Sequence, residues 1–272
     1  SRGLGDVYKR QSTELLLTRA CRRERRMLFS SLTFIFLFLP VVLAIYYLAP
    51  LKIRNLLLLL ASLIFYAWGE PVYVVLMILS ILLNYCCGRE IAANAEDERK
   101  AHRGMIFAVA VNLALLFFFK YYGFFLELVN SVTSVELTYR ELALPVGISF
   151  YTFQGISYVV DVYRGKAKAQ RSLLNFALYI ALFPQLIAGP IVRYEDIEPQ
   201  LAQRKVSARK LGQGAMLFLI GLAKKAVLAD TFKTVFEEIS AISASNLSVP
   251  MAWIGCITYA FEILSLIHIS EP

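Results

Sequence analysis

Long apolar runs separated by short polar segments dominate the chain from residue 32 onward. The first runs are each near the ~20 residues that a helix needs to cross the hydrocarbon core of a membrane. They cover residues 32–48, 53–68 and 72–87, and a fourth covers 105–119 with an aromatic extension to 129. The length and spacing of these runs predict transmembrane helices joined by short turns.

A further apolar run, PVGISFYTFQGISYVVDVY at residues 145–163, is interrupted by glycine, hydroxyl and amide side chains. Small and polar residues inside a span let helices approach closely and hydrogen-bond across the contact. We therefore expect this helix to face protein rather than lipid.

The next run, residues 173–192, contains helix-breaking residues in its middle. Proline lacks a backbone donor and clashes with the preceding helical turn. Irregular backbone at membrane depth is tolerated only where it is buried in protein or lines a wet cavity. A re-entrant or discontinuous helix is predicted here, followed by a polar stretch at 193–210 and apolar runs at 212–229 and 249–264.

Composition supports a membrane protein. Of the 272 residues, 58% are hydrophobic and 18% are charged, whereas charged residues make up about 25% of a typical soluble domain. The predicted fold class is all-α: a polytopic transmembrane helix bundle of about seven to nine membrane segments, including the re-entrant or broken helix.

The net charge of +8 does not call for nucleic acid as a partner. Residues 1–26 hold most of the surplus, and the rest lies in short loops, as cytoplasmic loop bias produces. If the basic loop at 52–54 is cytoplasmic, the parity of the spans places the polar segment 88–104 and the basic loop 164–171 on the same side.

Common soluble-enzyme and metal motifs are missing from the sequence. It holds no G-x-x-x-x-G-K-[ST] loop, no H-E-x-x-H and no C-x-x-C. His102 lies in a charged loop and His268 in the last eight residues, so neither is assigned to catalysis. No metal site is predicted.

Four segments resemble the membrane-bound O-acyltransferase family: MLFSSLTFIFLFLP, RNLLLLLASLIFYAW, LPVGISFYTFQGISYVVDVYRG and LFPQLIAGPIVRYEDI. The similarity covers residues 27–263 and is greatest to bacterial alginate O-acetyltransferase membrane subunits. It implies a helical bundle with a tunnel, through which an acyl group, expected to be acetyl, reaches hydroxyls of an extracytoplasmic polysaccharide such as alginate.

The resemblance also implies the reaction's other components. No cofactor is expected to be tightly bound; acetyl-CoA or another activated acyl carrier is the donor substrate. Expected partners are membrane lipid, the polysaccharide acceptor and periplasmic or extracellular acetylation proteins. The expected location is the bacterial inner (cytoplasmic) membrane, crossed several times.

The ends depart from the family pattern. SRGLGDVYKRQ and SLIHISEP resemble translated sequencing adapters, so residues 1–26 are interpreted as a non-native leader, 27–264 as a truncated membrane domain and 265–272 as a non-native tail. In the family, the histidine associated with acyl transfer lies downstream of a segment that TYAFEI resembles. We therefore expect the catalytic histidine beyond Leu264, and this chain alone to be inactive.

The interrupted segments are the expected tunnel walls. In the first, Ser149, Tyr151 and Gln154 are candidates to hydrogen-bond a carbonyl or cofactor group, with polar contacts between helices as the alternative. In the second, the candidates are Pro184, Gln185, Gly189, Pro190 and Arg193; Arg193 is expected to hold an anionic group or to form a loop ion pair. Glu262, ionisable inside an apolar run, is a further candidate.

Other functions remain open at this level. Broken helices with polar residues also occur in secondary transporters, and a non-catalytic scaffold would need no histidine. Within the acyltransferases, D-alanyl transfer to teichoic acid is the main rival, and peptidoglycan is an alternative acceptor.

Overall fold

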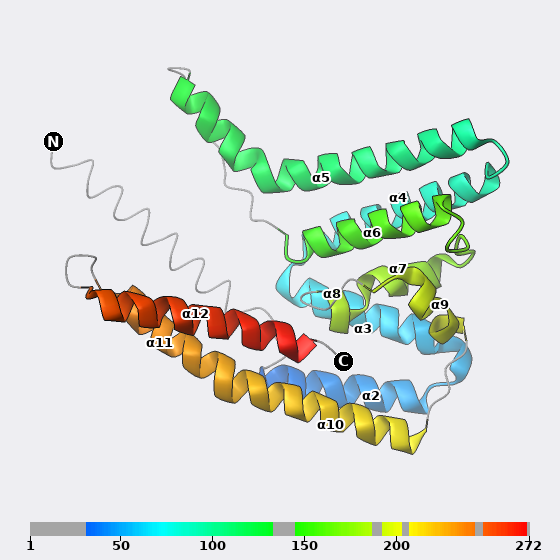
Figure 1. The fold of residues 1–272 in the computed structure, drawn as a ribbon. Helices are drawn as coiled ribbons and strands as arrows, with labels where there is room; N and C mark the ends of the chain where they lie inside the picture. Colours follow the sequence, from blue (N-terminus) through cyan, green and yellow to red (C-terminus); the bar gives the residue numbers. More distant parts are fainter. Residues whose placement is uncertain (1–30, 133–144, 187–191, 203–206, 243–246, 271–272) are drawn as a thin grey trace. The chain divides into compact units, whose positions relative to one another are not determined.

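The computed structural model describes residues 31–132, 145–186, 192–202, 207–242 and 247–270, and their ordered elements are helices without a strand. The predicted all-α class is confirmed. The predicted leader, 1–26, lies outside the described residues. The chain divides into two compact units, one up to Leu201 and one that includes residues 207–270 (Figure 1).

The first unit contains most of the helices. Its elements are η1 (Phe34–Phe38), α2 (Leu39–Leu48), η2 (Leu51–Ile53), α3 (Arg54–Gly69), α4 (Tyr73–Ala93), α5 (Glu98–Val132), α6 (Ile148–Tyr163), α7 (Leu173–Ala181), α8 (Phe183–Leu186) and α9 (Tyr194–Ala202). The predicted polar segment 88–104 is mostly helix, because α4 continues through it to Ala93 and α5 begins at Glu98.

Among the residues that the structure describes, three helical segments are long and apolar enough to cross a membrane: Leu51–Gly69, Tyr73–Ala93 and Glu98–Leu126. Phe34–Leu48 and Val249–Ile263 are shorter apolar helices. These segments fit a helical membrane bundle, and the total of seven to nine stays a prediction.

Helices α4, α5 and α6 pack closely around two glycines and an asparagine pair. A Cβ at Gly88 would lie 2.6 Å from the Tyr158 ring, and one at Gly155 would lie 2.6 Å from Nδ2 of Asn84. Asn84 Nδ2 donates to Asn112 Oδ1 at 3.1 Å, and Asn112 Nδ2 donates back to Asn84 Oδ1 at 2.9 Å. The expectation that α6 faces protein is therefore met on this side.

The three segments assigned to one membrane side lie at one end of the first unit (Figure 1). His102 Nδ1 is 3.2 Å from the hydroxyl of Tyr163, which joins the start of α5 to the end of α6. Asn55, after the basic turn at 52–54, donates to Oδ1 of Asn175 at the start of α7. This arrangement agrees with the predicted parity of the spans.

The second unit is a helical hairpin, in which α12 packs against the helical stretch that precedes it. Its elements are α10 (Ala208–Lys224), η3 (Lys225–Ala229), α11 (Asp230–Ser240) and α12 (Val249–Ser270). The sequence pattern missed α11, because that stretch is polar on one side and carries no apolar run. The backbone of α12 is helical across the predicted domain boundary at 264, and the boundary itself stays a prediction.

Candidate functional site at the break between α7 and α8

The predicted discontinuous helix is present in the first unit. Helix α7 ends at Ala181, Leu182 has φ −56° and ψ 115°, and α8 begins at Phe183. The backbone therefore leaves the helical region two residues before Pro184. Pro184 itself lies in the first turn of α8, where its missing N–H is not needed.

The break releases the carbonyl of Tyr179 from the helix, and two amide side chains occupy it. In a continuous helix that carbonyl would accept from the N–H of Phe183. Instead, Nε2 of Gln154 donates to it at 3.0 Å and Nε2 of Gln185 donates to it at 2.5 Å. Both predicted tunnel residues thus stabilise the broken backbone, and Gln154 forms the contact between helices that was its alternative role.

The N–H of Phe183, which the break separates from the Tyr179 carbonyl, also has a hydrogen-bond partner. The N–H of Phe183 donates to Oγ of Ser62 on α3 at 3.2 Å, and that hydroxyl donates to the Leu58 carbonyl at 2.7 Å. Ser62 is fully buried. Because an unsatisfied buried backbone group costs free energy, these side chains make the break a stable feature of the fold.

Gly147 brings the start of α6 against the end of α8. Its φ is +78°, and a Cβ there would lie 2.9 Å from the carbonyl oxygen of Leu186. Both the conformation and the space favour glycine. Tyr66 on α3 donates to the carbonyl of Val146 at 3.0 Å, so α3, α6 and α8 meet at one place.

A buried aromatic cluster holds the chain in place after residues 187–191. Those five residues lie outside the described part of the chain. Tyr158, Phe176, Tyr179 and Tyr194 are each fully buried, with ring centroids 4.6 to 5.2 Å apart from Phe176 to Tyr158, from Tyr158 to Tyr194 and from Tyr194 to Tyr179. Tyr179 donates its hydroxyl to the carbonyl of Val192 at 3.0 Å.

Burial raises the pKa of Tyr194, at the start of the polar helix α9. It lies within hydrogen-bond distance of Gln170 Nε2. Residues 192–194 are therefore held in place.

Two hydroxyls on α6 differ from the hydrogen-bonded polar groups described above. Within the described residues, Oη of Tyr151 and Oγ1 of Thr152 are buried and have no hydrogen-bond partner. Ser149, one turn earlier than Thr152, is half-buried. A buried hydroxyl without a partner carries a cost, so these atoms mark a place where another polar group would be stabilised.

The other predicted residues form no hydrogen bond with these two hydroxyls or lie outside the described residues. Arg193 is exposed and pairs with Glu195, with 3.6 Å between Nη1 and Oε1. Glu262 is half-buried on α12 of the second unit. Gly189 and Pro190 lie outside the described residues.

Sequence analysis missed Ser62, Asn84, Asn112, Tyr179 and Tyr194. An amide inside an apolar span was a usable signal for the asparagines, whereas only the fold reveals that Ser62 and Tyr179 meet the break. In the part of the chain that the structure describes, no group of three or more His, Cys, Asp or Glu side chains is arranged to hold a metal.

These features define a helical membrane protein with a broken helix held by buried polar side chains. The chain is 40% identical over 241 residues, 87% of its length, to a protein named as a probable alginate O-acetylase of Pseudomonas aeruginosa. It is 32% identical over 269 residues to the peptidoglycan O-acetyltransferase of Helicobacter pylori, and 27% identical over 143 residues to the teichoic acid D-alanyltransferase of Bacillus subtilis.

The chain spans 46% of the length of the Pseudomonas protein and 51% of the Helicobacter one, about half in each case, and the match covers 35% of the Bacillus protein. No protein-family model matches it. The chain is similar to the alginate O-acetylases over most of its own length, as the quoted motifs predicted.

Proposed function

We propose that the protein acts as a membrane-bound O-acyltransferase that transfers acetyl groups to hydroxyls of an extracytoplasmic polysaccharide. The observation that carries this proposal is 40% identity over 241 residues to alginate O-acetylases. The transporter and scaffold interpretations have less support, because the relatives reported above are named as transferases.

The first unit's contribution to this reaction is to bind and orient the acyl group. In acyl transfer, the acceptor hydroxyl oxygen attacks the acyl carbonyl carbon, the bond to the carrier breaks, and the hydroxyl proton passes through a general base to the leaving carrier. Tyr151 and Thr152 are the described residues with buried, unpaired hydroxyls. Each is proposed as a donor to a polar group of the substrate, and Tyr151 is the one assigned to the acyl carbonyl oxygen, whose negative charge grows during the attack.

The broken helix supports those donors. Gln154 lies one turn after Tyr151 on α6 and donates to the Tyr179 carbonyl. This contact fixes the rotation of α6 relative to α7. Gln154 and Gln185 are accordingly proposed as positioning residues. The general base, a histidine, is proposed to belong to the part of the relatives' length that this chain does not span.

Alginate is the preferred acceptor, because the alginate O-acetylase matches have the higher identity. Peptidoglycan is the second candidate, since the 269-residue match at 32% identity covers as much of this chain. The proposed donor is an activated acetyl carrier. The proposed partners are acetylation proteins on the outer side of the bacterial cytoplasmic membrane.

The test uses the complete reading frame recovered from the source locus. It is expressed in an alginate-producing bacterium that lacks its own alginate O-acetylase, and acetyl esters are measured by NMR on the purified alginate. Restored acetyl esters support the proposal. Acetyl on peptidoglycan alone would change the acceptor, and no acetyl on either polymer, with the protein present in the membrane, would contradict it.

Variants in the same strain test the site. Tyr151→Phe removes the unpaired hydroxyl, and we expect a fall of about tenfold or more in acetyl esters because one oxyanion donor is lost. Tyr121→Phe on the exposed face of α5 is the matched control. Equal acetylation in both variants would remove Tyr151 from the site.

A further inference from the structure

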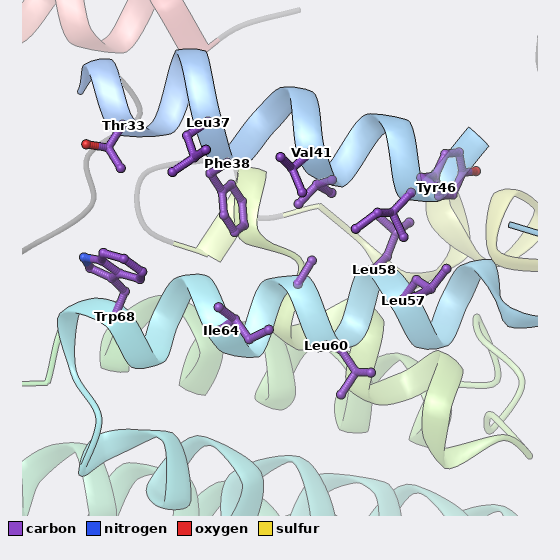
Figure 2. A pocket seen from close by; sticks show the side chains of 13 residues that line it. Thr33, Leu37, Phe38, Val41, Tyr46, Leu57, Leu58, Leu60, Ile64 and Trp68 are labelled. Atoms are coloured by element: carbon purple, nitrogen blue, oxygen red, sulfur yellow. The ribbon is translucent and has the colours of Figure 1, made fainter. Parts of the chain in front are cut away.

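An apolar groove runs between α2 and α3 in the first unit (Figure 2). Its volume is about 460 Å³, and its walls are aliphatic and aromatic side chains of η1, α2 and α3. Its middle is lined by residues such as Val41, Leu57, Ala61 and Ile64. The lining residues with polar atoms are Thr33 and Trp68 at one end and Tyr46 at the other (Figure 2).

The length of the groove matches one leaflet of a membrane. At a rise of about 1.5 Å per residue, the stretch of α3 from Leu57 to Trp68 extends ~16 Å. Half of a hydrocarbon core of ~30 Å is ~15 Å. A single acyl chain that enters at the Tyr46 end would therefore lie along the groove in the direction of Trp68.

Two cations stand at the Tyr46 end. The guanidinium carbon of Arg54 lies 5.0 Å from the centroid of the Tyr46 ring, and its Nε donates to the carbonyl of Ala49 at 3.0 Å. Lys52 lies exposed in the turn η2, two residues earlier. Within the described residues, neither cation forms a salt bridge.

We propose that this groove binds one acyl chain of an anionic phospholipid, with the lipid phosphate held by Arg54 and Lys52. The Arg54 guanidinium donates to the carbonyls of Ala49 and Tyr47 but has no carboxylate partner among the described residues, and its remaining N–H groups match the geometry of a phosphate. Each nearby cation favours an anionic headgroup over a zwitterionic one. The apolar walls contact the acyl chain of the lipid, and the two cations favour a negatively charged headgroup. This site is independent of the proposed acyl transfer.

The fluorescence of a tryptophan in the groove can report the binding of lipid. The chain has two tryptophans, and Trp68 lines the groove. In a Trp253→Phe background, the full chain is placed in phosphatidylcholine vesicles containing a minor fraction of phosphatidylglycerol with brominated acyl chains. Bromine quenches nearby tryptophan fluorescence. A second vesicle set carries the same mole fraction of brominated phosphatidylcholine instead.

We expect quenching of Trp68 by the anionic lipid to exceed quenching by the zwitterionic lipid, with about fivefold enrichment for each cation. Arg54→Gln and Lys52→Gln should each reduce that enrichment by a similar factor. Ala61→Phe, which places a ring in the groove, should reduce quenching by the anionic lipid. Arg99→Gln in the exposed start of α5 and Val75→Phe on the exposed face of α4 are the matched controls.

Equal quenching by the two lipids would mean that Trp68 senses ordinary bulk lipid, and the proposal would be wrong. Absence of quenching by either lipid would mean that protein covers the groove, and the proposal would also be wrong. Circular dichroism of each variant checks the fold. If Ala61→Phe fails to fold, the two surface charge variants still decide the outcome.

Discussion

The two units of the chain are stabilised in different ways. In the first unit, buried polar side chains join different helices: Asn84 pairs with Asn112, and Gln154 with the Tyr179 carbonyl. In the second unit, ring contacts join α11 to α12, with centroids 5.3 Å apart for Phe232 and Phe261 and 4.8 Å apart for Phe236 and Tyr259.

The two kinds of contact differ in how strictly they fix the packing of the helices. A buried amide must find its partner, because an unpaired polar group in an apolar surrounding is costly, so the first unit tolerates few alternative arrangements. Both units leave large apolar side chains exposed, such as Phe36 and Leu48 in the first and Trp253 in the second, but the contacts given above between α11 and α12 are apolar rings, which accept many apolar neighbours. The first unit is therefore expected to be the more sensitive to substitution.

The largest contrast should come from adding one methyl group to each unit. Gly155→Ala places a Cβ 2.6 Å from Asn84 Nδ2 and should destabilise the protein by about 1–3 kcal/mol through overpacking. Gly214→Ala in α10 meets no atom within 4 Å and should be neutral or stabilising, because alanine favours helix. Thermal denaturation in detergent measures both. Equal effects would remove the distinction between the units.

The asparagine pair comes next. Asn84→Leu leaves the buried Asn112 amide without its partner and should cost about 1–2 kcal/mol. Asn84→Leu combined with Asn112→Leu should cost less than the sum of the single changes, since no amide remains to be satisfied. A double-mutant cycle from denaturant titrations measures the coupling. Additive costs would show that the pair contributes no coupling.

The amides at the helix break should each have a smaller effect. Gln154→Leu and Gln185→Leu should each cost about 1 kcal/mol or less, because the other amide still occupies the Tyr179 carbonyl. Both changes together should cost more than the sum. Gln213→Leu, exposed on α10, is the control. Strict additivity in the denaturation midpoints would contradict the shared role of the two amides.

In the second unit, Phe236→Ala should cost about 1 kcal/mol by removing the ring contact with Tyr259. The effect should stay local. Hydrogen exchange should show faster opening of α11 and α12, with unchanged protection in α4 and α6. Loss of protection in α4 would show that the two units unfold together.

The smallest expected effect is a pH dependence at the start of α5. The side chain of Lys100 hydrogen-bonds Asp97 and lowers the pKa of that carboxyl. A lowered folded-state pKa gives stabilisation that is present above the unfolded value and is lost as pH falls through the folded value. The melting temperature of Asp97→Asn should therefore lie slightly below wild type at neutral pH and converge with it in acid. A constant difference would exclude ionisation as its source.

The sequence predicted some parts of this site better than others. The apolar runs located α3, α4 and α6, and the prolines in residues 173–192 predicted a break. The contacts at the break were not predictable, because Ser62 lies 121 positions from Phe183 in the chain and no local pattern joins them. The sequence analysis did not predict helix α11, because this helix contains many polar residues and no apolar run.

The sequence by itself determined the helical class, the membrane environment and the relationship to O-acetylases, because apolar run length and short motifs are local properties. The tertiary structure alone decided which polar side chains satisfy one another. It assigned Gln154 and Gln185 to one carbonyl, paired Asn84 with Asn112, and left the hydroxyls of Tyr151 and Thr152 without partners among the described residues. Hydrogen bonds act only over about 3 Å, so their pairing follows from the three-dimensional packing of distant helices.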